Sequence, residues 1–187
     1  SAVRGAPSVV DRAQLDVINA PLTLTNSEIS SGTTRGLYLE GTGLTPVVQN
    51  TAITNNVDVN TGNHLGYAIY QSTLNMQPTY SGLTFSGNDR NQAVIDIANL
   101  TQDVTLGGAP LGFICGYSHC PVQVPGGLTL TVQPGAVLDM SGKPVFFEVQ
   151  DGGTLLAQGD SANPITIIES GIQFDYGSVG RLSHCDI

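Results

Sequence analysis

Charged side chains are scarce in this sequence, and their scarcity argues against several classes of protein. Only 11% of the 187 residues are charged, Lys143 is the single lysine, and there is no tryptophan. Exposed helix faces are normally filled with glutamate, lysine and arginine, which this chain has in small supply. The net charge of −9 also argues against nucleic acid or anionic lipid as a partner, because both require clustered basic residues.

Long hydrophobic runs are also missing, although hydrophobic residues make up 40% of the chain. No run is long enough to span a bilayer, so no membrane span is expected. The 23 glycines indicate frequent turns, and the length is sufficient for a sizeable core. We therefore predict an all-β protein of many short strands. The composition, rich in Gly, Thr, Ser and Asn, favours an extracellular or cell-surface location.

The three cysteines cannot all pair within one chain. Cys115 and Cys120 bracket the tetrapeptide GYSH and are a candidate disulfide, while Cys185 lies near the end of the sequence. The alternative is three buried or idle thiols. A metal site formed by Cys115, His119 and Cys120 would lack a fourth ligand and the usual Cys-x-x-Cys spacing. No metal centre is predicted.

Three segments of the N-terminal half repeat one another: PLTLTNSEISSG at 21–32, VVQNTAITNN at 47–56 and TYSGLTFSGN at 79–88. Each has an apolar residue followed by Ser or Thr, a second apolar or aromatic residue five positions earlier, and Gly or Asn three positions later. The aligned sets are Ile29, Ile53 and Phe85, then Leu24, Val48 and Tyr80, then Gly32, Asn56 and Asn88. A second group of strands, at 35–41, 65–71 and 91–99, alternates apolar and polar residues.

The C-terminal half contains its own series. The segment VQPGAVLDMSG at 132–142 repeats as VQDGGTLLAQG at 149–159 with an offset of 17. A weaker copy at 176–182 aligns Gly180 with Gly153 and Leu182 with Leu155. Such periods predict a β-solenoid with parallel pairing between coils, apolar residues stacked inside and Asn ladders at turns. A sandwich or jelly roll would explain the short strands but not the register between segments.

The C-terminal hexapeptide Leu182 to Ile187 resembles the hexapeptide Leu24 to Ile29, after which the chain continues. We predict a cap, arm or first coil at 1–20 and parallel coils at 21–187 with an uncapped C-terminal end. Open strand edges invite pairing with another chain. Leu182, Cys185 and Ile187 are therefore a candidate interface for end-to-end association into filaments, or for the rest of a longer chain.

The segments LTVQPGAVLDM (130–140) and DGGTLLAQGDSANPITI (151–167) resemble the secreted bacterial right-handed parallel β-helix proteins. The coil containing NTAITNN and GYAIY is similar to the pectate-lyase-like β-helix repeat. The resemblance implies a right-handed, single-stranded parallel β-helix. It does not imply one function, because this fold carries lyases, glycosidases, adhesins, phage spikes and surface proteins.

Catalytic motifs of such enzymes are not found. Asn50-Thr51 is followed by Ala52 where a polygalacturonase-like sequence would have aspartate, and the chain has no Asp-Asp pair. A lyase needs a base beside Arg or Lys, and the nearest group is Asp89-Arg90 with Asp96, which we interpret as an exposed ion pair. Asp139, Asp151 and Asp160 recur near turns and are candidates for structural calcium. No cofactor is otherwise expected.

Tyrosines fall in or near the repeated strands, and aromatic rings can stack on sugars. Tyr38 and Tyr70 are the candidate carbohydrate contacts; Tyr67 and Tyr80 are the others. Asn99 opens a glycosylation sequon, Asn-Leu-Thr. The sequence therefore predicts a non-enzymatic structural or adhesive module that associates end to end. The alternative is a polysaccharide-binding or lyase-like, polysaccharide-degrading domain.

Overall fold

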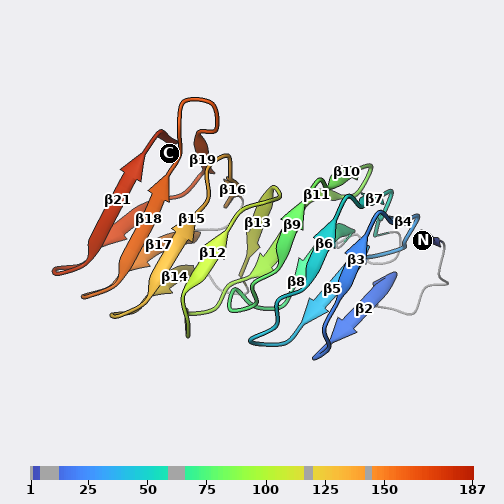
Figure 1. The fold of residues 1–187 in the computed structure, drawn as a ribbon, viewed down its shortest axis with the longest axis horizontal. Coiled ribbons are helices and arrows are strands. Elements are labelled where there is room, and N and C mark those ends of the chain that lie inside the picture. Colours follow the sequence, from blue (N-terminus) through green and yellow to red (C-terminus); the bar gives the residue numbers. More distant parts are fainter. Residues whose placement is uncertain (1, 5–12, 59–65, 116–119, 142–144) are drawn as a thin grey trace. The chain divides into compact units, whose positions relative to one another are not determined.

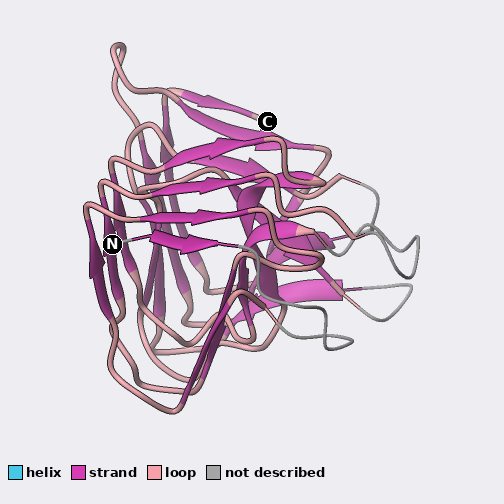
Figure 2. Cartoon of the chain, turned by 90° about the vertical axis from the view of Figure 1, so that its right-hand side faces the viewer, coloured by secondary structure: helices cyan, strands magenta, loops and turns pink. Residues whose placement is uncertain are grey.

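The chain is all β, as the composition predicted. The computed structural model describes residues 2–4, 13–58, 66–115, 120–141 and 145–187, and no helix occurs among them (Figure 2). The chain divides into two compact units, one of residues 1–72 and 76–94 and one of residues 73–75 and 95–187. In each unit, short strands from successive windings of the chain pair side by side in parallel (Figure 1). This arrangement is a parallel β-solenoid.

The first unit contains three stacks of strands, in the orders β1-β4-β7-β10, β3-β6-β9 and β2-β5-β8-β11. Their bounds are β1 Ala2–Arg4, β2 Leu15–Ile18, β3 Thr23–Thr25, β4 Glu28–Ser30, β5 Leu37–Glu40, β6 Val47–Gln49, β7 Ala52–Thr54, β8 Tyr67–Gln71, β9 Thr79–Ser81, β10 Thr84–Ser86 and β11 Arg90–Asp96, the last of which ends in the second unit. Both β1 and β2 pair in parallel with later strands, so strands of the segment 1–20 take part in the coils.

The register predicted for the first unit is confirmed. Ile53 lies opposite both Ile29 and Phe85, although these two residues are unequally distant from it in the sequence. The second predicted column pairs in the same way, with Val48 opposite Leu24 and Tyr80. Most of the difference in coil length lies between β7 and β8. The apolar repeat thus identified residues that stack in register, of which Ile29, Ile53, Val48 and Tyr80 are buried and Leu24 and Phe85 half-buried.

The predicted asparagine ladder is present and buried. Nδ2 of Asn56 donates to Oδ1 of Asn88 at 2.8 Å, and Oδ1 of Asn56 accepts from the backbone N–H of Gly32 at 3.0 Å. Asn88 in turn donates to the backbone carbonyl of Ile53 at 2.8 Å. Because Asn56 is fully buried, these bonds satisfy polar groups that water does not reach.

The corner between β3 and β4 recurs between β6 and β7 and between β9 and β10. Asn26, Asn50 and Gly82 stand at equivalent corners with φ of 49°, 48° and 59°. Asn and Gly are the residues that adopt this left-handed conformation at low cost. His184 takes the same conformation, with φ of 48°, between the last two strands of the chain. The similarity of the two hexapeptides therefore reflects a shared corner geometry.

The second unit has stacks in the orders β12-β15-β18-β21 and β14-β17-β20, and a third that contains β13-β16-β19-β22. The bounds are β12 Val104–Leu106, β13 Leu111–Ile114, β14 Cys120–Val124, β15 Thr129–Val132, β16 Val137–Asp139, β17 Val145–Val149, β18 Thr154–Gln158, β19 Ile165–Ile168, β20 Ile172–Phe174, β21 Val179–Ser183 and β22 Cys185–Asp186. The core includes Phe113 and Phe147, whose rings meet edge to face at 6.4 Å.

The offset of 17 predicted in this half is not the coil period. Val149 lies opposite Val124 on one side and Phe174 on the other, and both are separated from it in the sequence by more than that offset. The two similar segments occupy different corners of one winding, between β15 and β16 and between β17 and β18, where Gly135 and Gly152 both have φ of 74°. Each of these corners needs a glycine with positive φ for the same kind of tight turn, which explains their similar sequences.

The alignment of the weaker third copy was also wrong. Leu155 lies opposite Gly180, and Leu182 lies opposite Ala157. The strands β18 and β21 do pair, but two residues away from the predicted register. In an extended strand a two-residue shift keeps the same face inward, so the apolar pattern alone does not detect it.

Candidate functional site

The first unit brings the two candidate carbohydrate-contact tyrosines together. Tyr38 on β5 lies opposite Tyr70 on β8, and their rings stack at 5.4 Å between centroids with 9° between planes. Tyr67 stacks on Tyr70 at 6.0 Å. We call Tyr38, Tyr70 and Tyr67 the tyrosine row. Tyr80 is not part of it, because its ring is buried and its hydroxyl donates to Oε1 of Gln71 at 3.3 Å.

Two arginines and a glutamate lie beside the tyrosine row. The guanidinium carbon of Arg35 lies 4.7 Å from the ring centroid of Tyr70 and 5.6 Å from that of Tyr38, within the range of cation–π attraction. Arg90 lies 6.0 Å from the Tyr67 ring. The Tyr38 hydroxyl donates to Oε2 of Glu40 at 2.7 Å. The pKa of Tyr38 is raised from 10.0 to about 12, mainly because the hydroxyl is partly buried and secondly because it donates this hydrogen bond.

The row differs from a flat sugar platform in one respect. The Tyr70 ring stacks on two other tyrosine rings, and Arg35 lies over part of the stack. A sugar ring that stacked on Tyr70 would have to share this ring with Tyr38, Tyr67 and Arg35. The half-buried Tyr38 and Tyr70 would instead contact a ligand by ring edges and hydroxyl groups, beside the Glu40 carboxylate.

Sequence reasoning found Tyr38 and Tyr70 but missed Arg35 and Glu40 as their neighbours. Glu40 was within reach of the alternation rule, because residues two apart on a strand share a face. Tyr67 was beyond that rule, because it stands three positions from Tyr70. The stacking of these two rings is a result of the folded backbone.

The residues considered for lyase chemistry are engaged in structural contacts. Oδ2 of Asp89 accepts from the backbone N–H groups of Asp58 at 2.9 Å and Gly66 at 3.0 Å. It thereby joins Asp58 to Gly66; residues 59–65 lie outside the described residues. The guanidinium carbon of Arg90 lies over the Tyr67 ring. Asp96 lies at the end of β11.

The acids considered for calcium also lie at turns. Oδ1 of Asp139 accepts from the backbone N–H of Ser141 at 2.9 Å. Oδ1 of Asp160 accepts from the N–H groups of Ala162 and Asn163 at 2.8 Å, and these bonds lower the pKa of Asp160. Across the described part of the chain, no group of three or more His, Cys, Asp or Glu side chains is arranged to hold a metal ion.

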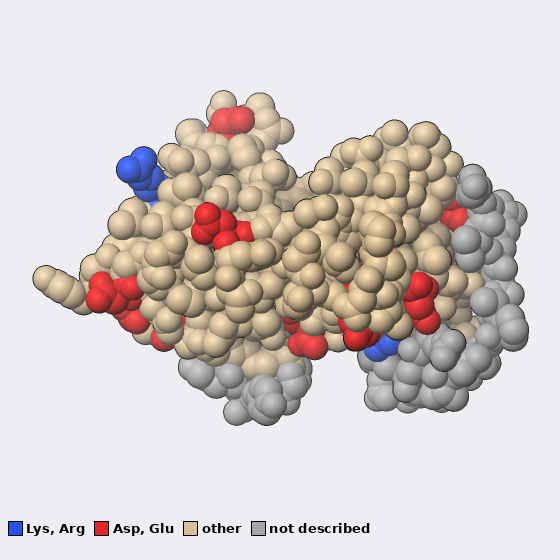
Figure 3. All heavy atoms as spheres, turned by 60° about the horizontal axis from the view of Figure 1, so that its bottom comes forward, with Lys and Arg blue, Asp and Glu red and all other residues tan. Residues whose placement is uncertain are grey.

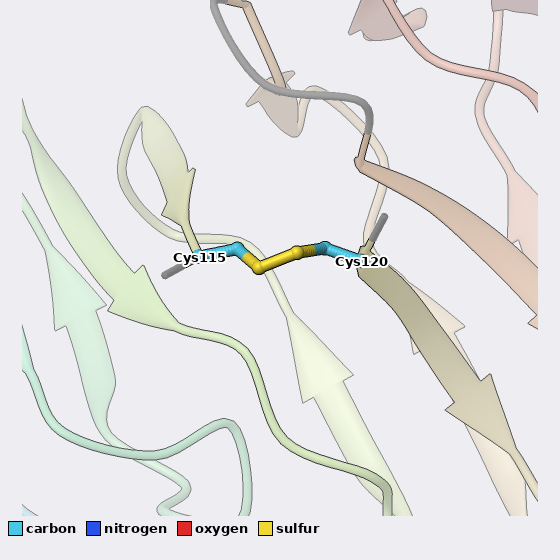
Figure 4. The surroundings of a disulfide bond; sticks show 2 residues. All are labelled: Cys115 and Cys120. Atoms are coloured by element: carbon cyan, nitrogen blue, oxygen red, sulfur yellow. A yellow bond between two sulfur atoms is a disulfide. The ribbon is translucent and has the colours of Figure 1, made fainter. Parts of the chain in front are cut away.

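A disulfide joins Cys115, just after β13, to Cys120, the first residue of β14 (Figure 4). Their Cα atoms lie 6.3 Å apart, within the usual range for such a bridge. His119, considered as a metal ligand with these cysteines, lies outside the described residues. Cys185 has a free, half-buried thiol whose Sγ lies 3.1 Å from the carbonyl oxygen of Ala157.

The last winding of the second unit exposes apolar side chains on strands that end their stacks. Leu182 is 40% exposed and Ile187 is 63% exposed. Strands β20, β21 and β22 stand last in the order of their sheets. We call β20–β22 and Ile187 the terminal coil, whose exposed apolar residues are Phe174, Val179, Leu182 and Ile187.

The face drawn in Figure 3 carries scattered acidic side chains and few basic ones, with uncharged residues between them. This distribution agrees with the low and negative charge of the sequence. Within the described ranges we find no helix with the length and hydrophobicity of a membrane span.

No protein-family model matches the sequence, and neither a curated protein nor a solved structure shows significant similarity to it. The parallel solenoid therefore rests on the strand pairing of this chain alone. Function has to be inferred from the tyrosine row, the disulfide and the terminal coil.

Proposed function

We propose that the chain is a non-enzymatic structural or adhesive module of an extracellular or cell-surface protein, and that its terminal coil binds a second copy end to end. The observation that carries this proposal is the exposure of apolar side chains along strands that end their stacks. The finer assignment we favour is a right-handed, single-stranded β-helix of the pectate-lyase-like type. The Cys115–Cys120 disulfide supports an oxidising location.

A second copy suits the terminal coil for a geometric reason. An occupant must offer strands that extend three parallel stacks at once, with apolar residues between them. The chain itself has strands in this arrangement, including the edge strands β2 and β3 of the first unit. A contact between two different ends of identical chains is heterologous, and it produces filaments when the repeat does not close into a ring.

Replacement of Leu182 and Ile187 by aspartate tests this interface. Burying an apolar side chain contributes about 1.5–3 kcal/mol, so the double variant is expected to weaken association at least ~10-fold. Sedimentation and negative-stain microscopy over a concentration series would measure it. Val57→Asp is the matched control, because Val57 is an exposed apolar residue of the first unit. A wild-type chain that stays monomeric at high concentration would contradict the proposal.

Cys185 adds a covalent readout to the same experiment. If its thiol bridges two copies, non-reducing electrophoresis will show dimers that Cys185→Ser abolishes. Association that survives in Cys185→Ser but not in the Leu182/Ile187 double variant would assign the interface to apolar contacts. Association unaffected by either change would place the interface elsewhere.

Carbohydrate binding by the tyrosine row is the second candidate function. Its support is that the fold brings Tyr38, Tyr70, Arg35 and Glu40 to one place, with aromatic edges, hydroxyls and both charges together. Such mixed groups suit a hydroxyl-rich ligand that is bound and not turned over. Degradation would be expected only if a base were available, and Asp89 is already engaged by two backbone donors.

Alanine at Tyr38 and Tyr70 separates this candidate from the first. On glycan arrays and in titrations with pectin or alginate, the double variant should lose binding by about 10-fold or more, since each aromatic contact contributes about 1 kcal/mol. Tyr176→Ala is the matched control, because Tyr176 is 96% exposed and outside the row. Unsaturated products from these polysaccharides would instead establish a lyase. If the Tyr38/Tyr70 double variant binds as tightly as the wild-type chain, the tyrosine row is not the binding site.

A further inference from the structure

The segment that follows β11 contains the single Asn-x-Ser/Thr tripeptide of the sequence, Asn99-Leu100-Thr101. Residues 97–103 form no strand. The second unit contains this segment together with Asn75, which contacts it. The tripeptide therefore lies in a connection between the strands β11 and β12, and its geometry decides whether it is open to modification.

One buried side chain holds the backbone on both sides of Leu100. Nδ2 of Asn75 donates to the carbonyl oxygen of Asn99 at 2.8 Å, and Oδ1 of Asn75 accepts from the N–H of Thr101 at 2.8 Å. The N–H of Leu100 donates to the carbonyl oxygen of Gln123 at 3.1 Å. The backbone of the tripeptide is thus held by three hydrogen bonds that use none of its side chains.

The side chains of the tripeptide divide between core and surface. Leu100 is buried, with 3% of its surface exposed, whereas Asn99 and Thr101 are both exposed. The two groups that define the sequon, the Asn99 amide and the Thr101 hydroxyl, are accordingly presented to solvent while the residue between them anchors the segment. A glycan on Asn99 would extend outward without displacing a buried group.

We propose that Asn99 is an acceptor for an N-linked glycan when the chain passes through a eukaryotic secretory compartment. This inference rests on the extracellular location proposed above. The donor is a lipid-diphosphate-linked oligosaccharide, acted on by an oligosaccharyltransferase. The Asn99 Nδ2–C1 bond forms as the bond from C1 to the diphosphate oxygen breaks. The lipid diphosphate leaves with the electron pair, and the amide gives up one proton.

Secretion of the full chain from cultured eukaryotic cells behind a cleavable signal sequence tests the proposal. We expect a single mobility shift that peptide N-glycosidase F removes. Asn99→Gln and Thr101→Val should lack the shift completely, whereas Thr101→Ser should retain it. The Thr101 variants form a matched pair, because both keep the backbone N–H that Asn75 binds and differ in the hydroxyl.

The folded state gives a second readout. Because the Asn99 side chain is exposed, the glycosylated and enzymatically deglycosylated chains should have the same thermal midpoint. A wild-type chain that is secreted without the shift, or a Thr101→Val chain that retains it, would overturn the proposal. For any variant that is not secreted, translation into microsomes provides the same mobility test. End-to-end association and polysaccharide binding are measured in separate experiments. A chain that is not glycosylated at Asn99 can therefore be told apart from a chain that fails to associate or to bind polysaccharide.

Discussion

Replacing Phe147 with alanine is expected to lower the free energy of unfolding by about 3–5 kcal/mol, a large part of the stability of a typical domain. Phe147 is fully buried in β17, where it lies opposite Val122 on one side and Ile172 on the other. Its ring also meets Phe113 edge to face. Removing it would leave a cavity between three successive windings, which the hydrogen-bonded backbone of the stack cannot readily fill.

Phe146→Ala is the matched control for this prediction. Phe146 is the preceding residue of the same strand and is only half-buried, on the opposite face. Urea unfolding of the two variants should show a much smaller loss for Phe146→Ala. Equal losses would contradict the assignment of Phe147, and not Phe146, to the core.

Asn56→Ala is expected to cost about 2–4 kcal/mol, because buried polar groups left without partners each cost about 1–3 kcal/mol. The change removes the acceptor of the Gly32 N–H and the donors to the Thr54 carbonyl and to Oδ1 of Asn88. Asn56 is fully buried, so water does not replace these bonds. The loss should appear as a lower urea midpoint with an unchanged slope.

Asn50→Gly is the control for the asparagine ladder. Asn50 is also a repeated asparagine, but its role is to adopt a φ of 48° at a corner, which glycine adopts readily. Its substitution should change stability little. If Asn56→Ala proves equally neutral, the ladder contributes nothing to stability, and hydrogen exchange of the Gly32 amide should then show no protection.

The repeats allowed much of the first unit to be predicted. Ile29, Ile53 and Phe85 align without gaps in their local sequence, and each corner requires a left-handed residue three positions before the aligned one, supplied by Asn26, Asn50 and Gly82. The corner conformation and the packing of the core therefore repeat with the same spacing in this unit, and the sequence repeat predicted both.

In the second unit, local similarity misled the prediction. Gly135 and Gly152 serve the same kind of turn at different corners of one winding, so their surroundings look like successive coils. Turn chemistry depends only on neighbouring residues, whereas coil period depends on the perimeter of the whole winding. Only the pairing of Val124 with Val149 and of Val149 with Phe174 reveals the true period of the coils.

The candidate sites, like the fold, were predicted only in part from the sequence. The sequence by itself determined the all-β class, the parallel stacking of coils, the inward apolar columns and the asparagine ladder, because these follow from local conformation and periodic burial. Only the tertiary structure decided that Arg35 lies over Tyr70, that Tyr67 completes the tyrosine row and that Leu100 is buried between exposed Asn99 and Thr101. These contacts depend on the register of separate windings and the path of their connections, which no short pattern encodes.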